Sequence, residues 1–231
     1  MAKPRVLVVL TSVAKVPKSG KIIGWYLPEL AHPWHVLHDK VELTYASPKG
    51  GEAPLDPASV ELFKEDPVCA DFYENHTDVW KKTIKLSEVA GRAADFDAVF
   101  YPGGHGPMFD LVVDEDSLRI IADLHAQDKV ISAVCHGPAA LVNAKTASGE
   151  PLLSGREVTG FDNVAEDLFK FTDEMDFSLE DRLKEISGGK YVKAAEDPLA
   201  EKVVVDGKII TGQNPASSYG VANAILKALG L

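Results

Sequence analysis

Cys135 is the residue of this sequence whose surroundings best suit covalent chemistry. It follows the apolar run 130–134 and precedes His136, Gly137 and Pro138, where a helix is expected to begin. Glycine permits a tight bend and proline suits the first helical position, so a thiol at this strand-to-helix turn would stand above the sheet. Free N–H groups at a helix start favour the thiolate, which is the nucleophilic form. An ordinary buried cysteine at the end of a core strand explains the same segment equally well.

A glycine-rich turn is the second chemical feature. Residues 97–102 have the pattern of an apolar strand, and residues 103–106 (Gly-Gly-His-Gly) follow at its carboxyl end. Ligands collect at the carboxyl ends of strands in open α/β sheets, so this turn and Cys135 are expected to meet. Bare N–H groups in such a turn can hold a developing oxyanion, although a plain tight turn has the same sequence. No Gly-Lys-Ser/Thr follows, which excludes a phosphate loop of that type.

Alternating strands and helices must position these residues. Near-continuous apolar runs are typical of strands that are buried on both faces of a parallel sheet. The sequence predicts strands over residues 5–12, 41–47, 97–102, 130–134, 157–160, 191–192, 203–205 and 208–211. Amphipathic spacing and end signals predict helices over residues 26–39, 116–127, 138–145, 163–169, 179–186 and 215–229. The Asp-Gly step at 206–207 indicates a hairpin.

This alternation predicts an α/β fold. We expect a three-layer sandwich with a mostly parallel sheet, helices on both faces and a nucleophile elbow at Cys135. At 231 residues the chain is long enough to bury one core without disulfides or a metal. We therefore expect a single domain over residues 1–231, in which the Pro-rich and charged segment at about 48–90 forms an insertion or lid.

Charge and cysteine content narrow the classes of partner and compartment. The net charge of −11 argues against nucleic acid as a partner, because no excess of basic residues neutralises phosphates. Two cysteines form no disulfide framework and match no zinc pattern, so we expect a reducing compartment: the cytoplasm, or also the nucleus. The apolar run 6–10 is too short for a signal peptide, and no run approaches the length of a membrane span.

Two carboxylates have ordinary explanations when they are taken alone. Glu29 fits a surface position on an exposed helix. Glu166 follows Asn163 by three residues, which fits the third position of a capping box. Neither residue identifies itself as catalytic by its immediate neighbours.

The remaining histidines and the second cysteine are interpreted as structural. His32, His35 and His38 have a crude i, i+3, i+6 spacing that could suggest a metal. Histidines scattered on one amphipathic segment are more often core or interface residues, so no metal site is expected. Cys69 follows Asp-Pro-Val and is expected to be a structural residue.

Several segments together resemble the DJ-1/PfpI superfamily, and most closely its Hsp31-like branch. Cys-His-Gly-Pro alone is moderately specific, but the ordered combination of segments is strongly so. The matches extend from residue 6 to the C-terminus, and the resemblance implies a flavodoxin-like sandwich that forms a homodimer. The matching segments are Gly24-Trp-Tyr-Leu-Pro-Glu-Leu-Ala-His-Pro33, Tyr101-Pro-Gly-Gly-His-Gly106, Ala133-Val-Cys-His-Gly-Pro-Ala139, Thr159-Gly-Phe-Asp-Asn-Val-Ala-Glu166 and Thr211-Gly-Gln-Asn-Pro-Ala-Ser217.

The resemblance implies catalytic roles for four side chains. Cys135 would be the nucleophile, and His136 and Glu166 would complete a Cys-His-Glu triad. Glu29 would be the acid beside the thiol, able to donate to a thiolate when protonated and to shuttle a proton when ionised. Glu166 would orient the imidazole, as the third member of a triad does.

The resemblance also implies a substrate site and a reaction. The backbone N–H groups of Gly104 and His136 would form an oxyanion hole, and His105 would line the pocket. Members of the Hsp31-like branch are described as glutathione-independent glyoxalases that convert methylglyoxal to lactate. This reaction implies a small 2-oxoaldehyde substrate, a lyase of the lactate dehydratase type, and no cofactor.

Two other functions stay open at this point. A stress-responsive holdase chaperone would bind unfolded client proteins, and a protein deglycase or an oxidation sensor would use Cys135 differently. A cysteine amidase or peptidase is the third possibility. An amidotransferase of this fold would place His-x-Glu late in the chain, whereas no histidine follows His136 here, which counts against it.

Overall fold

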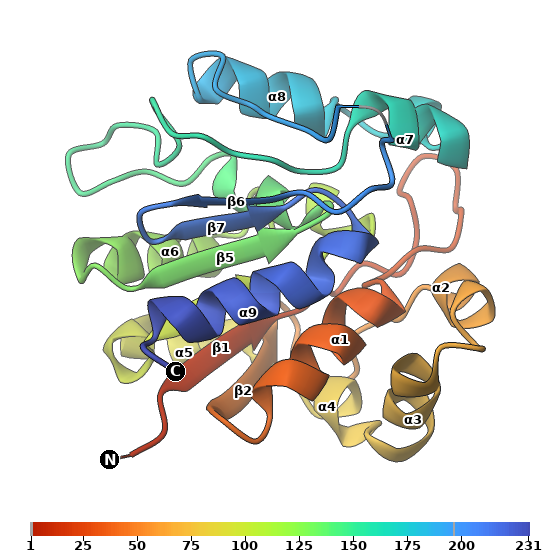
Figure 1. Ribbon diagram of the computed structural model, residues 1–231, viewed down its shortest axis with the longest axis horizontal. Helices are drawn as coiled ribbons and strands as arrows, with labels where there is room; N and C mark the ends of the chain where they lie inside the picture. The colour runs from red at the N-terminus through yellow and green to blue at the C-terminus, as the bar shows by residue number, and fades with distance from the viewer. Residues whose placement is uncertain (1, 196) are drawn as a thin grey trace.

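A mostly parallel sheet forms the centre of the protein. The computed structural model describes residues 2–195 and 197–231. Within these residues seven strands pair in the order β3-β2-β1-β4-β5-β7-β6, and only the β6–β7 pair is antiparallel (Figure 1). The strands are β1 (Arg5–Val9), β2 (Glu42–Ser47), β3 (Ile84–Lys85), β4 (Ala98–Tyr101), β5 (Val130–Val134), β6 (Val203–Asp206) and β7 (Ile209–Gly212).

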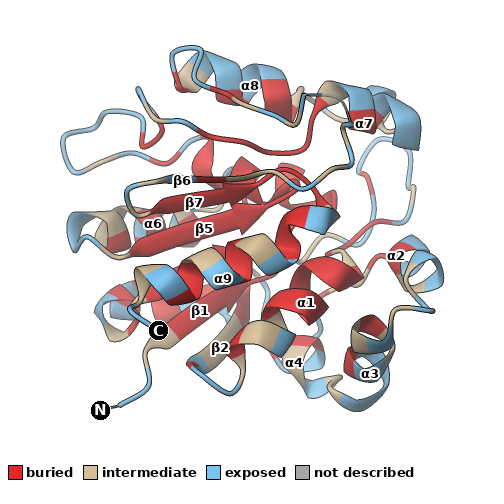
Figure 2. Ribbon diagram, in the orientation of Figure 1, coloured by how far each residue is buried: buried red, intermediate tan, exposed pale blue. Residues whose placement is uncertain are grey.

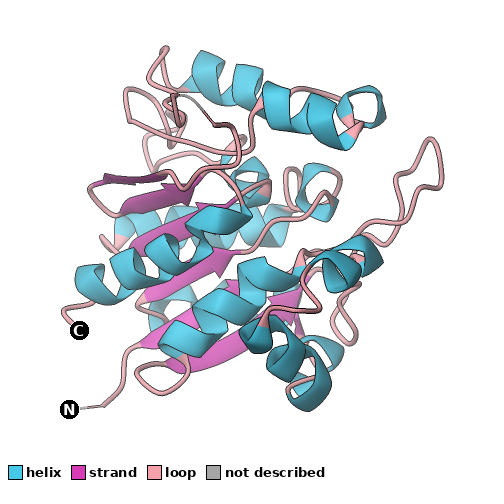
Figure 3. Cartoon of the chain, turned by 45° about the vertical axis from the view of Figure 1, so that its right-hand side comes forward, coloured by secondary structure: helices cyan, strands magenta, loops and turns pink. Residues whose placement is uncertain are grey.

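Helices cover both faces of this sheet, which confirms the predicted three-layer sandwich. Helices α1 and α9 pack together on one face, whereas α5 and α6 lie on the other (Figures 1 and 3). The helices are α1 (Leu27–Leu37), α2 (Pro57–Leu62), α3 (Pro67–Asn75), α4 (Asp78–Lys81), α5 (Leu86–Val89), α6 (Glu115–Ala126), α7 (Asn163–Phe169), α8 (Leu179–Ile186) and α9 (Ser218–Ala228). Short 3-10 helices occur at Ala90–Asp95, Gly106–Met108, Gly137–Leu141, Thr172–Glu174 and Pro215–Ser217.

The central strands are the most deeply buried part of the fold. Every residue of β4, β5 and β7 is buried, as expected for strands covered on both faces (Figure 2). The strands that precede the glycine-rich turn and Cys135 are neighbours, because β4 pairs with β5 from Ala98–Val130 to Tyr101–Ala133. Their carboxyl ends therefore open at the same edge of the sheet.

Two predicted elements are wrong. Residues 157–160 and 191–192 form no strand of the sheet and meet only in one isolated bridge between Val158 and Tyr191. Strand β6 already occupies the free side of β7. The Thr159 N–H therefore donates to the side-chain hydroxyl of Thr211, at 3.0 Å, and not to a main-chain carbonyl of the sheet. The hairpin itself is confirmed, with Gly207 in the left-handed conformation (φ +61°).

The predicted helix over 138–145 is also wrong, because a single 3-10 helix replaces it. This helix ends at Leu141, and all of its residues are buried. The Asn143 amide then donates to the Val112 carbonyl at 2.8 Å, and Lys145 bridges to Pro151. These contacts hold residues 143–145 in a non-helical conformation, so the helix ends soon after the elbow.

The segment at about 48–90 contains the four helices α2 to α5 and the edge strand β3. Helices α2 and α3 pack against α1, and β3 extends the sheet beside β2. Whether this segment acts as a lid stays a prediction. None of the helices in the described parts of the chain combines the length and apolar character that a bilayer span requires.

Helix α1 connects this segment to the sheet, and its packing can be tested at one position. Leu30 is buried between α1 and the core, whereas His35 on the same helix is exposed. We expect Leu30→Ala to lower the free energy of unfolding by about 2–5 kcal/mol, because it leaves a cavity. The matched His35→Ala variant should stay within about 0.5 kcal/mol of the parent in urea unfolding. Equal losses in the two variants would show that α1 does not pack as described.

Candidate active site

Cys135 lies at a strained turn between β5 and a 3-10 helix. Its φ of +60° is in the left-handed region, which costs a residue with a side chain about 1–2 kcal/mol. Two backbone hydrogen bonds hold it there: the Cys135 N–H donates to the Gly212 carbonyl, and the Phe161 N–H donates to the Cys135 carbonyl, both at 2.9 Å. The turn is thus a nucleophile elbow in which the cysteine itself carries the strain.

Gly137 has a different task from the one expected of it. The bend does not require it, because its φ is not in the left-handed region. A Cβ at Gly137 would instead lie 2.1 Å from the Tyr101 carbonyl oxygen. Glycine is needed here so that the chain after the elbow can approach the end of β4 closely.

His136 connects Cys135 to Glu166 through its two ring nitrogens. Its Nδ1 lies 3.5 Å from Cys135 Sγ, and its Nε2 lies 2.7 Å from Glu166 Oε2. The capping interpretation of Glu166 is wrong, because Asp162 caps α7 by accepting from the Ala165 N–H at 2.7 Å. The Glu166 side chain is therefore free to point inward, where it is 10% exposed.

His105 shares the Glu166 carboxylate with His136. Its Nε2 lies 2.8 Å from Oε1, and its ring stacks on Phe171 with centroids 3.8 Å apart. Burial, and then the nearby His136, lower the pKa of His105 to about 4, so at neutral pH it is uncharged and donates through Nε2. Its Nδ1 is then an acceptor, and it has no partner among the described residues.

The two histidines also determine the charge of Glu166. Burial alone would raise the pKa of this carboxyl, but His136 and the hydrogen bonds from both rings outweigh burial and lower it. Glu166 therefore stays ionised and orients the rings. Nitrogen and oxygen atoms of His105, His136 and Glu166 lie within 4.8 Å of one another, a set that could also hold a metal. Each histidine uses its own carboxylate oxygen, so hydrogen bonding alone accounts for the arrangement.

Glu29 is the second carboxylate of the site, and its surroundings favour the neutral form, unlike those of Glu166. It is fully buried in α1, which rules out the exposed-helix interpretation. Its Oε2 accepts from the Gly103 N–H at 2.8 Å, whereas Oε1 has no hydrogen-bond partner in the described structure. Burial raises the pKa of Glu29 to about 8, so the carboxyl is protonated at neutral pH and lies beside the Cys135 thiol as a donor.

The thiolate expected from the helix start is not the resting form. Burial raises the pKa of Cys135, and negative charge on the adjacent Glu29, when that carboxyl ionises, raises it further. Only a five-residue 3-10 helix follows the elbow, so few aligned peptide dipoles oppose these effects. The Gly104 N–H acts in the other direction and favours the anionic form of both groups.

The two backbone N–H groups predicted to form an oxyanion hole are those of Gly104 and His136. Gly104 has a φ of +78°, and a Cβ there would lie 2.2 Å from the Gly24 carbonyl oxygen. The N–H groups of Gly104 and His136 donate to no backbone carbonyl in the described loops and turns. Both are thus available to a developing negative charge near Sγ.

A small cavity of about 40 Å³ lies over Cys135, and its walls are mainly apolar. Water needs at least about 10–15 Å³ of such volume, so the cavity admits a molecule of only a few heavy atoms. Five of the six sequence-predicted site residues line this cavity, and the sixth, Glu166, lies behind it against the rings of His105 and His136. The sequence analysis did not identify four aromatic side chains of the site. Two of them had a usable signal in their position, because Tyr26 lies one helical turn before Glu29 and Phe161 lies five residues before Glu166. The missed residues are Tyr26, Phe161, Phe169 and Phe171.

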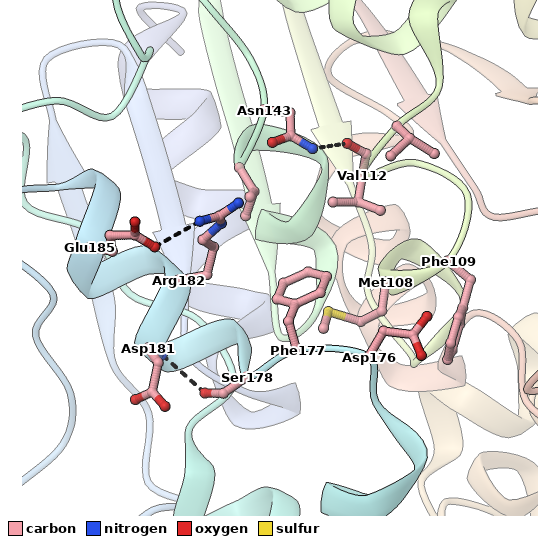
Figure 4. Close-up of a pocket in the computed structure, with 12 residues that line it drawn as sticks. Met108, Phe109, Val112, Asn143, Asp176, Phe177, Ser178, Asp181, Arg182 and Glu185 are labelled. Atoms are coloured by element: carbon pink, nitrogen blue, oxygen red, sulfur yellow. Dashed lines mark hydrogen bonds and ion pairs between the residues drawn. The ribbon is translucent and has the colours of Figure 1, made fainter.

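A second depression lies elsewhere and lacks this chemistry. It is a groove of about 620 Å³ between α8 and the 3-10 helix at Gly106–Met108 (Figure 4). Arg182 pairs with Glu185 at 2.7 Å along its rim. No cysteine or histidine lines it.

The histidine series of α1 does not converge on a common point. His32 turns toward Asp66 and Cys69, with Nε2 at 3.1 Å from Oδ2 and 3.5 Å from Sγ. His38 instead stacks on Trp34 with centroids 4.1 Å apart, and His35 is exposed. The i, i+3, i+6 spacing therefore carries no meaning as a ligand set.

Known proteins match this chain in sequence and in fold. The model of the DJ-1/PfpI family matches residues 28–228. Glyoxalase 3 of Candida albicans is 33% identical over 97% of this chain and 98% of its own, and the glutathione-independent glyoxalase HSP31 of Saccharomyces cerevisiae is 31% identical over 99% of each chain. Among solved structures, the Rapid Encystment Protein 24 KDa of Francisella tularensis has a TM-score of 0.90 at 38% identity, covering 98% of this chain and 99% of its own. The crystal structure of glyoxalase III from Candida albicans has a TM-score of 0.86 at 31% identity, covering 97% of each chain.

Fold and elbow together define a flavodoxin-like α/β protein with a cysteine at its reactive turn. The chain belongs to the DJ-1/PfpI family, and within it to the Hsp31-like branch.

The strain at the elbow predicts an unusual stability order. We expect Cys135→Gly to be more stable than Cys135→Ala by up to about 1.5 kcal/mol in urea unfolding. Relief of the left-handed conformation contributes about 1–2 kcal/mol, from which the greater freedom of unfolded glycine subtracts about 0.5–1 kcal/mol. Ala133→Gly in the preceding strand is the control and should destabilise. A glycine at 135 that is less stable than alanine would mean that the elbow is unstrained.

The protonated Glu29 predicts a pH dependence of stability. Its pKa rises from 4.5 in the unfolded chain to about 8 in the fold, so the folded state holds a proton that the unfolded state has released. This contribution to stability is fully present below pH 4.5 and is lost as the pH rises through about 8, with a slope of up to about 1.4 kcal/mol per unit. Glu29→Gln should remove this pH dependence. As the pH rises, the melting temperature of the parent should therefore fall relative to that of the variant. Parallel profiles would contradict a buried proton at Glu29.

Proposed function

We propose that this protein is a glutathione-independent glyoxalase that converts methylglyoxal and related 2-oxoaldehydes to lactate. The observation that carries the proposal is the enclosed group of Cys135, His136 and a protonated Glu29 at the base of a cavity of about 40 Å³. Full-length relatives that bear the name of glutathione-independent glyoxalase or glyoxalase 3 support it. The reaction adds one water overall, which makes the enzyme a lyase of the lactate dehydratase type.

The first step is addition of the thiol to the aldehyde. The Cys135 sulfur bonds to the aldehyde carbon, and the thiol proton ends on the former carbonyl oxygen, giving a hemithioacetal. The N–H groups of Gly104 and His136 stabilise negative charge on that oxygen as it develops. Glu29 donates a hydrogen bond to the sulfur and so favours the thiolate at the moment of attack.

The second step moves a proton within the bound substrate. A base removes the hydrogen of the former aldehyde carbon, and its electron pair moves toward the neighbouring carbonyl to give an enediolate. Reprotonation on the neighbouring carbon leaves a lactoyl thioester on Cys135. Glu29, once ionised, and His136 are the groups beside the sulfur that can carry this proton.

Hydrolysis completes the cycle. Water attacks the thioester carbon, the carbon–sulfur bond breaks, and the thiol is regenerated as lactate leaves. His136, held by Glu166 at 2.7 Å, is positioned to activate the water. Two electrons move only inside the substrate, so the atoms and charges balance without an external oxidant or reductant.

His105 fits a positioning role in this scheme. Its Nδ1 is a buried acceptor without a partner in the described structure, and its ring lines the cavity. The hydroxyl group of the hemithioacetal would donate a hydrogen bond to this Nδ1 atom. The size of the cavity also favours a small aldehyde over a peptide, which weakens the peptidase alternative.

The decisive experiment measures lactate. The reduced protein is incubated with methylglyoxal without glutathione, and each lactate enantiomer is quantified. We expect Cys135→Ala to reduce formation to background and Glu166→Gln to lower kcat/KM by about 100-fold or more, because the imidazole loses its orientation. Asp167→Asn, a neighbouring exposed carboxylate on α7, should match the parent. Absence of lactate from the folded parent protein would overturn the proposal.

A further inference from the structure

A second group of potential ligands lies outside the proposed active site. His32 is on α1, and Asp66 and Cys69 are at the beginning of α3, so the group joins two elements that pack together. The glyoxalase scheme uses none of these three residues. A nitrogen, an oxygen and a sulfur atom of the group lie within 4.8 Å of one another.

The geometry differs from that of a catalytic relay. At His136 the sulfur faces Nδ1 and the carboxylate faces Nε2, on separate ring nitrogens. At His32 both partners face the same atom, with Asp66 Oδ2 at 3.1 Å and Cys69 Sγ at 3.5 Å from Nε2. One ring nitrogen carries at most one proton, so it cannot pass a proton between these two partners. Three different donor atoms within 4.8 Å of one another are instead close enough to share one metal ion.

The two separations measured from His32 Nε2 match those expected around a tetrahedral ion. Zinc bonds of about 2.0–2.2 Å to nitrogen and oxygen and about 2.3 Å to sulfur place tetrahedral ligand atoms ~3.3 Å (N–O) and ~3.5 Å (N–S) apart. The two separations measured from Nε2, 3.1 and 3.5 Å, lie within about 0.2 Å of these values. An ion could therefore enter with little movement of the side chains.

The three ligands are held in place by their surroundings. Asp66 Oδ1 accepts from the N–H groups of Val68 and Cys69 at 2.9 and 3.0 Å, which leaves Oδ2 for an ion. The His32 ring stacks on Tyr219 of α9, with centroids 4.2 Å apart and planes 14° apart. Such supporting contacts fix the orientation of ligands in metal sites.

The group is buried except on the side of Asp66, which solvent can reach. Cys69 is fully buried and His32 is 7% exposed, whereas the Asp66 side chain is 30% exposed. An ion entering past Asp66 would have three protein ligands and a position for water. Thiolate, imidazole and carboxylate together suit a borderline-soft divalent ion.

We propose that His32, Asp66 and Cys69 form a zinc site that ties α3 to α1. Cys69 then binds as a thiolate and releases its proton when the ion enters. Because the fold presents all three ligands together, the ion stabilises the folded chain and holds the α2–α3 segment against the helical layer.

Cobalt(II) is the probe that tests this site, since it reports its ligands by absorption. The reduced, chelator-treated protein is titrated with Co²⁺ and then with Zn²⁺. We expect one Co²⁺ per chain, a thiolate-to-cobalt charge-transfer band and intense tetrahedral ligand-field bands, all displaced by Zn²⁺. Zn²⁺ should also raise the melting temperature of the parent protein. A parent that shows no thiolate band overturns the proposal without the need for any variant.

Matched variants locate the band. Cys69→Ser should abolish it, whereas Cys135→Ser should retain it, since each removes one of the two cysteines. His32→Gln should weaken Zn²⁺ binding by more than about 100-fold, because even residues that only support a ligand cost about 10- to 100-fold. The exposed His35→Gln on the same helix should have no effect. A band that disappears with Cys135→Ser, or binding lost with Glu166→Gln, would place the ion at the active site and contradict the proposal.

Discussion

The left-handed backbone at Cys135 is the constraint on which the site depends. The strain is maintained by main-chain hydrogen bonds to Gly212 at the end of β7 and from Phe161 before α7. Three distant parts of the chain therefore meet at one residue. The same meeting brings Glu166 to His136 and closes the aromatic wall over the thiol, so the elbow organises both the reactive group and its enclosure.

Two carboxylates in one site differ because their neighbours differ. Glu29 has a backbone donor and a thiol beside it but no cation, and burial keeps it protonated. Glu166 is nearly as buried, yet two imidazoles donate to it and keep it ionised. Pairs of titratable groups whose environments separate their pKa values are the usual source of acid and base roles. The fold thus stores a proton at Glu29 and a charge at Glu166.

Much of this arrangement was predictable from the sequence, and the remainder depends on contacts between distant residues. The apolar runs located β4 and β5, and with them the shared edge where the glycine turn and Cys135 meet. The burial of Glu29 was not predictable from its helix, because it depends on packing against Gly103, 74 residues away. The error at 157–160 has a similar cause: a segment of strand-like composition lost its place at the sheet to the β6–β7 hairpin. Local sequence patterns predict where helices and strands form, but they do not predict which segments pair with each other in the sheet.

The two-residue strand β3 ends one side of the sheet, and it limits how molecules of this protein can meet. Both of its residues are exposed, and one is Lys85. An edge so short and charged offers few free main-chain groups to the strand of another molecule. Growth of the sheet from chain to chain is blocked there, so self-association across this edge has to use side-chain surfaces rather than strand pairing. The sheet can therefore be extended by another chain only at its opposite edge, along the longer strand β6.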